Sequence, residues 1–234
     1  MEKAESGANR CEYKHMQMIA LDGPSVAPQS GGKPKQLVVL LHGYGSNGDD
    51  LISLAPYWAD LLPEAEFVSP NAPFPCEGNP YGGYQWFGLG DRNPEMLRGG
   101  TRAAATILDA YLDAVLKARG LDESKLALVG FSQGTMMALH VGPRRALAPA
   151  AILGFSGALV AAESLAAELK SKPPVLLVHG MADPVVPFAA MDAAATALKA
   201  LGIPVETIAR PGLPHSIDQD GLSRGGGFLH KHFA

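Results

Sequence analysis

Cysteine is scarce in this chain of 234 residues, and its two copies, Cys11 and Cys76, stand far apart. Neither belongs to a CxxC pair, and two thiols cannot build the disulfide framework of a small secreted protein. We therefore expect both to be free thiols in a reducing compartment.

Long apolar runs are also missing. No stretch approaches the roughly 20 apolar residues of a membrane-spanning helix. The first ten residues, MEKAESGANR, lack the apolar segment of a secretory signal. We interpret residues 1–14 as a polar tail and expect a cytoplasmic protein without stable membrane insertion.

Positive charge is in short supply as well, because 19 Lys and Arg residues face 23 Asp and Glu residues. The basic residues are scattered along the chain, whereas a nucleic-acid-binding surface needs them clustered. No HExxH or comparable spacing of metal ligands occurs either. We expect no nucleic-acid partner and no metal.

What is present is a globular composition, with 47% hydrophobic and 18% charged residues. No linker divides the chain, which predicts a single domain over residues 15–234. Buried-strand patterns alternate with helical patterns, and this alternation predicts a mostly parallel sheet with helices on both faces. Strands are expected at residues 16–21, 36–41, 65–68, 125–131, 150–153, 174–178 and 204–209, and helices at 50–62, 101–119, 133–141, 187–201 and from 216 onward.

The last expected helix has an unusual composition. Ser216 and Gln219 have the spacing of a capping box at its start. Gly225, Gly226 and Gly227 stand in its middle, and each costs roughly 1 kcal/mol relative to alanine. We expect this helix to be broken or frayed.

The segment Gly130-Phe131-Ser132-Gln133-Gly134 matches G-x-S-x-G between an expected strand and an expected helix. The match alone is weak, but this context is that of a nucleophile elbow. The serine then sits on a tight turn, and the following helix N-terminus favours a developing negative charge. A second candidate, Ser156 in LGFSG, lacks the second glycine at the spacing that G-x-S-x-G requires. It is also not followed by a clear helix.

A serine hydroxyl needs a base before it is a good nucleophile. In an elbow enzyme the acid and then the histidine follow the serine along the chain, each just past a strand. Asp183 and His215 meet this requirement. The other histidines precede the acid or lie near an end of the chain, at His15, His42, His140, His179, His230 and His232.

The turn LHGYGS, residues 41–46, follows the expected strand at 36–41. An HG-type turn at this place can supply one backbone N–H to an oxyanion hole, and the residue after the nucleophile supplies the second. We assign these two donors to the amides of Tyr44 and Gln133. The glycines of this turn are equally explained by a tight turn alone.

The segments LLHGYGSNGDD, QWFGLGDR, GFSQGTMMAL, VHGMADPVVP and LPHSI, in that order, resemble the phospholipase/carboxylesterase family of α/β hydrolases. They span residues 38–217. The resemblance implies the α/β-hydrolase fold, Ser132, Asp183 and His215 as catalytic triad, and Tyr44 and Gln133 as oxyanion donors. It also implies a small-molecule ester or thioester substrate, no cofactor, and a place for Trp86 near the acyl pocket.

Residues 70–100 interrupt the alternation with a stretch rich in proline, glycine and aromatics. So long a structureless segment is usually a functional loop or lid. We expect it to form one wall of the acyl site, with Trp86 and Phe87 as the contacts and with Tyr81 and Tyr84 packed nearby. The alternative is that Trp86 only anchors the loop to the core.

Three functions are compatible with these residues. The first is a carboxylesterase for small to medium acyl esters. The second is a lysophospholipase or acyl-protein thioesterase with a long acyl groove. The third is a non-catalytic binding protein on the same fold, which the presence of all three triad residues disfavours. The natural substrate and the oligomeric state, a homodimer included, are left open.

Overall fold

The computed structural model describes residues 20–77, 79, 82–90 and 93–234. The expected polar tail at 1–14, Cys11, Tyr81 and most of the expected strand at 16–21 lie outside these residues. No helix within the described ranges is long and apolar enough to cross a membrane.

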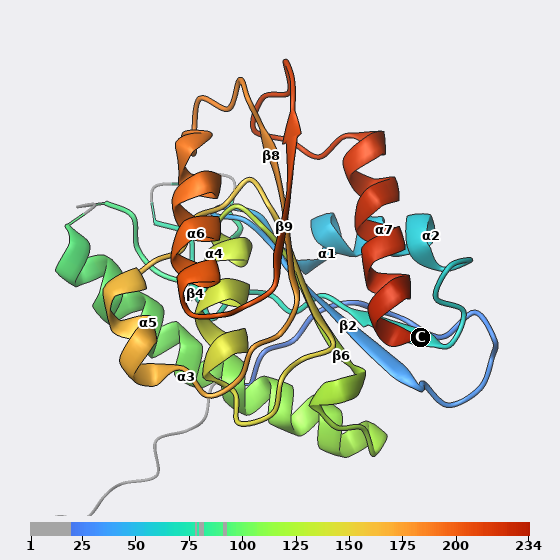
Figure 1. Cartoon of the computed structure of the whole chain (residues 1–234). Helices are drawn as coiled ribbons and strands as arrows, with labels where there is room; N and C mark the ends of the chain where they lie inside the picture. Colours follow the sequence, from blue (N-terminus) through green and yellow to red (C-terminus); the bar gives the residue numbers. More distant parts are fainter. Residues whose placement is uncertain (1–19, 78, 80–81, 91–92) are drawn as a thin grey trace, which may run out of the picture.

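A seven-stranded sheet forms the centre of the molecule, in the order β1-β3-β2-β6-β7-β8-β9 (Figure 1). Only β1 runs antiparallel to its neighbour, and the other strands pair in parallel. The strands are β1 (Ser25–Val26), β2 (Gln36–Leu41), β3 (Ala65–Val68), β6 (Leu126–Phe131), β7 (Ala151–Phe155), β8 (Val175–Gly180) and β9 (Val205–Arg210). The expected mostly parallel sheet is confirmed.

Helices cover both faces of this sheet (Figure 1). One face carries α3 (Pro94–Arg119), α4 (Gln133–Val141), α5 (Ala162–Glu168) and α6 (Ala189–Ala200). The other carries α1 (Gly48–Leu51), α2 (Ala55–Trp58) and α7 (Gln219–Phe233). Short 3-10 turns complete the order: η1 (Ile52–Leu54), η2 (Glu123–Lys125) and η3 (Gly142–Arg144).

The strand β2 shows why its sequence is a continuous apolar run. Leu37, Val39 and Leu41 pack into the core on the α3 and α4 side. Val38 and Leu40 pack into the core on the α2 and α7 side. Successive side chains of a strand point to opposite faces, so a strand covered on both faces needs apolar residues at every position.

Three expected elements differ from the structure. The helix expected at 50–62 is divided into α1, η1 and α2, because Pro56 in the first turn of α2 has no N–H to donate to the preceding turn. Residues 20–21 of the first expected strand are not extended in the sheet, whose edge is β1 instead. The helix expected at 101–119 begins earlier, at Pro94, where the Asn93 side chain accepts a hydrogen bond from the Glu95 N–H.

The described part of residues 70–100 contains secondary structure where the sequence predicted a structureless stretch. A small antiparallel hairpin pairs β4 (Phe74–Pro75) with β5 (Tyr84–Gln85). Residues 94–100 belong to the first turns of α3. Two-residue strands carry little sequence signal, and the glycines at 99 and 100 weaken the helical pattern there.

The terminal helix α7 is continuous through its three glycines, contrary to expectation. Its N-cap is Asp218, whose side chain accepts a hydrogen bond from the Gly221 N–H, and not Ser216. A β-carbon on Gly226 would lie 2.7 Å from the Trp58 ring, and one on Gly225 would lie 2.7 Å from Leu153. These two glycines allow α7 to pack closely against α2 and the sheet.

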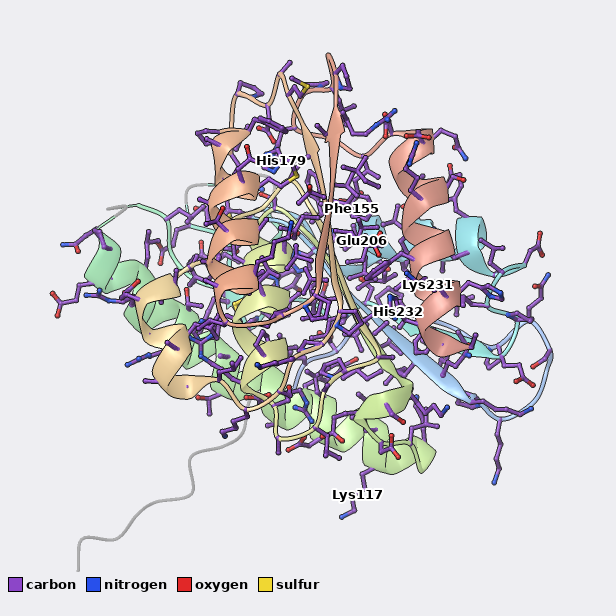
Figure 2. All side chains as sticks on the ribbon, in the orientation of Figure 1. Lys117, Phe155, His179, Glu206, Lys231 and His232 are labelled. Atoms are coloured by element: carbon purple, nitrogen blue, oxygen red, sulfur yellow. The ribbon has the colours of Figure 1, made fainter. Side chains whose placement is uncertain are left out.

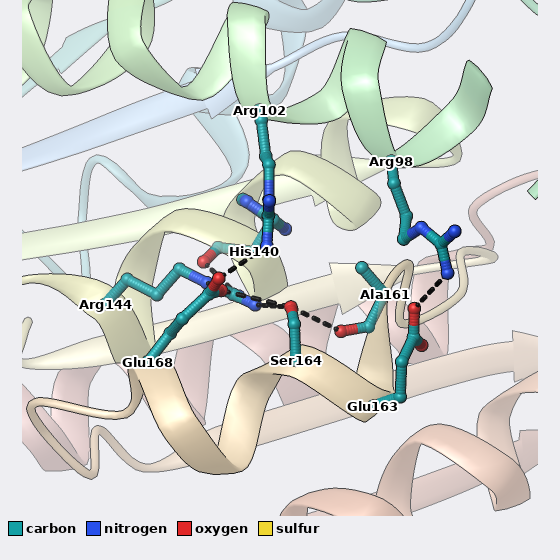
Figure 3. Close-up of polar contacts among 8 residues, drawn as sticks. All are labelled: Arg98, Arg102, His140, Arg144, Ala161, Glu163, Ser164 and Glu168. Carbon is teal, nitrogen blue, oxygen red and sulfur yellow. Dashed lines mark hydrogen bonds and ion pairs between the residues drawn. The ribbon is translucent and has the colours of Figure 1, made fainter. Parts of the chain in front are cut away.

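A cluster of charged side chains ties α5 to α3 and α4 (Figure 3). Glu168 accepts hydrogen bonds from Arg102 of α3 at 2.6 Å and from Arg144 of η3 at 2.7 Å. Arg144 also donates to the His140 carbonyl oxygen in α4 and to the Ser164 hydroxyl in α5. Near the start of α5, Glu163 accepts a further hydrogen bond from Arg98 of α3 at 2.9 Å.

The glycine run of α7 yields a stability prediction. We expect Gly226→Ala to destabilise the fold by about 1–3 kcal/mol, because the new methyl group would overlap the Trp58 ring. That ring is 1% exposed, and its indole N–H donates to the Leu222 carbonyl oxygen at 2.9 Å, so it has little room to move. Urea denaturation of the purified variant measures the change.

Gly227→Ala is the matched control for this substitution. Nothing lies within 4 Å of a β-carbon at this position, so only the helical preference of alanine acts. We expect a gain of about 0.5–1 kcal/mol. A Gly226→Ala variant as stable as the Gly227→Ala variant would contradict the packing explanation.

Candidate active site

Ser132 occupies a strained turn between β6 and α4. Its backbone angles are φ 54° and ψ −114°. Residues other than glycine rarely adopt this combination. The flanking glycines make the turn sterically feasible, because a β-carbon on Gly134 would lie 1.8 Å from the Leu41 carbonyl oxygen. One on Gly130 would lie 2.3 Å from the Thr135 nitrogen. The elbow expected from the sequence has the required close packing.

The structure brings Ser132, His215 and Asp183 together from three separate loops. Nε2 of His215 lies 3.0 Å from Oγ of Ser132. Nδ1 of His215 lies 2.7 Å from Oδ2 of Asp183. An ionised carboxylate can only accept, so Nδ1 carries the proton of a neutral ring and Nε2 can accept from the serine hydroxyl. This arrangement can take the proton from a nucleophilic serine.

Several donors hold the Asp183 carboxylate in place. Oδ1 accepts hydrogen bonds from the N–H groups of Val185 at 2.8 Å and Val186 at 2.9 Å. The side chain is fully buried, and this desolvation acts to raise its pKa. The hydrogen bonds from His215, Val186 and Val185 outweigh desolvation, and the pKa of the Asp183 carboxyl lies below its ordinary value.

His179 is a further member of the site that the sequence did not indicate. It is the penultimate residue of β8 (Figure 2), and its Nε2 lies 2.9 Å from the Val186 carbonyl oxygen and 3.3 Å from Oδ2 of Asp183. The carbonyl oxygen only accepts, so Nε2 is a donor. His179 therefore braces the turn that carries the acid. Its position before Asp183 excludes it as the catalytic histidine, and its spacing of four residues from Asp183 does not by itself predict the contact.

The two residues assigned to the oxyanion hole both line the cavity next to Ser132. Gln133 is the first residue of α4, so its backbone N–H has no acceptor within the helix. The N–H groups of Gly45 and Ser46 bond to the carbonyl oxygens of Tyr84 and Gly43, which orders the turn at Tyr44. Both backbone N–H groups can therefore donate a hydrogen bond to an oxyanion that forms beside the serine.

The Gln133 side chain connects the elbow to residues 86–87. Its carbonyl oxygen accepts from the Trp86 N–H at 2.8 Å, and its amide donates to the Phe87 carbonyl oxygen at 2.7 Å. The Trp86 ring is fully buried, and its Nε1–H donates to the His42 carbonyl oxygen at 3.0 Å. The structure does not place Trp86 at the cavity, whereas Phe87 lines it.

A cavity of about 770 Å³ opens onto Ser132 and His215. Its volume lies within the range of pockets for small organic ligands. Part of its wall comes from Phe87, Leu89, Gly90 and Leu97, as expected for the segment 70–100. Met136 of α4 and Val160 before α5 extend this apolar surface.

Comparison with known sequences places this geometry in context. Residues 21–233 match the phospholipase/carboxylesterase family. Esterase YpfH of Escherichia coli is 31% identical over 194 residues, which cover 81% of this chain and 80% of that protein. An acyl-protein thioesterase 1 of Gibberella zeae is 28% identical over 211 residues, which cover 83% and 89% of the two chains.

Solved structures show the same similarity. The crystal structure of esterase PE8 matches with a TM-score of 0.87 and 46% identity, over 91% of this chain and 99% of that one. Arabidopsis thaliana SOBER1 matches with a TM-score of 0.71 and 23% identity, over 85% and 99% of the two chains, which is a likeness of fold alone. The expected α/β-hydrolase fold is confirmed.

Trp86 and Phe87 are neighbours with different surroundings, so they can be tested as a pair. Trp86→Phe keeps a ring in the core but leaves the His42 carbonyl oxygen without its donor. We expect a loss of about 1–3 kcal/mol in stability, and an equal proportional change in kcat/KM for acetyl, butyryl and octanoyl esters. Thermal denaturation and steady-state kinetics measure both.

Phe87→Ala removes a wall of the cavity instead. We expect kcat/KM to change unequally across the same three esters, because each additional buried methylene contributes about 0.8 kcal/mol. If Trp86→Phe alters the order of preference and Phe87→Ala does not, the assignment of the wall to Phe87 is wrong.

Proposed function

The chain belongs to the phospholipase/carboxylesterase family and is a carboxylic ester hydrolase, and we propose that it is a serine carboxylesterase for small to medium acyl esters. The observation that carries the proposal is the continuous hydrogen-bond chain from Ser132 through His215 to Asp183, which opens onto a cavity of bounded volume. A cytoplasmic location and a homodimer stay predictions from the sequence.

In the proposed mechanism His215 accepts the Ser132 proton while Oγ attacks the ester carbonyl carbon. Asp183 keeps the imidazole in the correct tautomer and stabilises its cationic form. The backbone amides of Tyr44 and Gln133 bind the oxyanion, each contributing about 3 kcal/mol if they resemble measured oxyanion donors. His215 then gives the proton to the leaving oxygen, and the C–O bond of the ester breaks to leave an acyl-enzyme.

Water completes the reaction by the same route. His215 takes a proton from a water molecule, whose oxygen attacks the acyl carbon, and the proton passes to Ser132 as the acid product leaves. The groups that transfer the proton and bind the oxyanion in this cycle all belong to the chain, and water is the second substrate. The burial of the triad aspartate and its several donors support a rigid, preorganised site.

A second candidate function is hydrolysis of long-chain thioesters or lysophospholipids. The match to a protein named acyl-protein thioesterase 1 supports it. Phe87, Leu89 and Leu97, together with the loop before α5, bound the apolar part of the cavity, which favours acyl chains of limited length. Rates on esters and thioesters of increasing acyl length separate the two functions.

Replacing the proposed nucleophile tests the function most simply. We expect Ser132→Ala to lower kcat/KM for a p-nitrophenyl ester by at least about 10⁴-fold, with the thermal midpoint near that of the wild type. Ser156→Ala is the control, because Ser156 also has a positive φ of 47° at a strand end but does not line the cavity. Loss of activity in the Ser156→Ala variant alone would overturn the assignment.

The depressed pKa of Asp183 yields a prediction for the pH dependence. A carboxyl with a lowered native pKa stabilises the fold above its ordinary value of about 3.9, and this stability is lost as the pH falls through the native value. Asp183 is therefore an anion throughout the weakly acidic range. We expect the acid limb of kcat/KM to follow one ionisation, that of the general base.

Asp183→Asn should remove the anion and favour the wrong imidazole tautomer, with a loss in kcat of about 10⁴-fold at every pH. The measurement is a pH profile of kcat/KM for both proteins. An acid limb that requires two protons, or a variant with wild-type activity, would contradict this role.

A further inference from the structure

The cavity beside Ser132 has two chemically different ends. Toward α3 and α4 its wall is apolar, with Leu97 and Met136 among the contributors. Toward α1 its wall comes from the loop after β2 and carries Tyr44, Ser46 and Asp50. Because α3 and α1 cover opposite faces of the sheet (Figure 1), Leu97 and Asp50 belong to elements on opposite sides of the sheet.

The polar end is held in a defined conformation. The Ser46 hydroxyl donates to Oδ2 of Asp50 at 2.6 Å. The Asp50 backbone N–H donates to the Asn47 side chain at 2.9 Å, which caps α1. Within the described part of the chain no donor binds the second carboxylate oxygen, Oδ1 of Asp50. That oxygen is left to accept a hydrogen bond from a ligand.

The charge of this end is also distinctive. Among the described residues that line the cavity, Asp50 and His215 are the only ones with an ionisable acidic or basic side chain, Tyr44 apart. Asp50 is therefore the one carboxylate among the described lining residues. A single carboxylate in a cavity with apolar walls attracts donors and repels anions.

Each end suits one half of an ester, an inference that rests on the proposed serine mechanism. The acyl chain is apolar and is favoured by the surface of Leu97 and Met136. The alcohol half then points to the other end, past Ser132, toward Ser46 and Asp50. Leu97 and Met136, the described side chains named at the apolar end, offer a glycerol hydroxyl no oxygen acceptor, whereas the polar end offers a carboxylate.

We propose that Ser46 and Asp50 form a leaving-group subsite that selects alcohols bearing hydrogen-bond donors and disfavours alcohols bearing a negative charge. A glycerol monoester is the class of substrate that fits. An ester whose alcohol carries a phosphate or a sulfonate does not fit, because its charge would approach the Asp50 carboxylate. Asp50 acts here as a specificity-determining residue and takes no part in proton transfer.

The test compares two butyrate esters, glycerol monobutyrate and the butyrate ester of hydroxypropanesulfonate. The intrinsic reactivity of each ester cancels when the ratio of their kcat/KM values is compared between enzymes. We expect the wild type to favour the glycerol ester, and Asp50→Asn to reduce the ratio by about fivefold or more. We expect Asp50→Glu to retain the preference, because it keeps the charge.

Asp49→Asn is the matched control. Asp49 is exposed, adjoins Asp50 in α1 and does not line the cavity, so its loss changes the net charge equally. Asp49 and Asp50 are both exposed, and they differ in that Asp50 lines the cavity. We expect Asp49→Asn to leave the ratio within about twofold of wild type, because solvent outside the cavity screens its charge from a bound ester. An unchanged ratio in Asp50→Asn, or an equal change in Asp49→Asn, would overturn the subsite.

Two further readouts keep these outcomes interpretable. The thermal midpoint of Asp50→Asn shows whether the loop after β2 has lost its structure, and in that case Ser46→Ala decides the matter. If Ser46→Ala leaves the ratio at its wild-type value, the subsite is excluded. Failure of the serine mechanism itself is recognised separately, by a Ser132→Ala variant that still hydrolyses both esters.

Discussion

The close approach of α4 to the end of β2 is the constraint on which the site depends. Gly134 lies so near the Leu41 carbonyl oxygen that no other residue fits. This contact forces a sharp turn between β6 and α4, and Ser132 accepts a positive φ as the result. Strain of about 1–3 kcal/mol at such a residue persists only where the surrounding packing determines the backbone.

The remaining parts of the site follow from this turn. It presents the Ser132 hydroxyl to His215, and it leaves the first N–H of α4 beside the same cavity. The Gln133 side chain then fixes residues 86–87, so the elbow also positions one wall of the cavity. Elsewhere in the fold, Glu168 and its arginine partners tie α5 to α3 and η3 (Figure 3).

Much of the fold was predictable because its central strands are buried on both faces. Such strands are continuous apolar runs, and β2 and β3 have the expected bounds. The placement of Asp183 and His215 beside Ser132 was predictable because each follows a strand whose carboxyl end meets the same edge. These signals come from local sequence and from chain order.

The errors arose where tertiary packing decided the outcome. The glycines of α7 lower its helical preference, yet Gly226 is needed for contact with Trp58, which no local pattern reveals. Trp86 was expected at the acyl site, with an anchor to the core as the alternative. In the structure its ring is buried in the core, and its indole N–H donates to the His42 carbonyl oxygen. The brace from His179 depends on the shape of the turn at 183–186, which becomes visible only in three dimensions.

The central claim is that Ser132 becomes covalently acylated during turnover. The most direct measurement is mass spectrometry of the protein after reaction with a serine-directed phosphonate, followed by mapping of the modified peptide. We expect one adduct per chain, on Ser132, formed at a rate that parallels the loss of esterase activity. An adduct on Ser156, or full loss of activity with Ser132 unmodified, would contradict it.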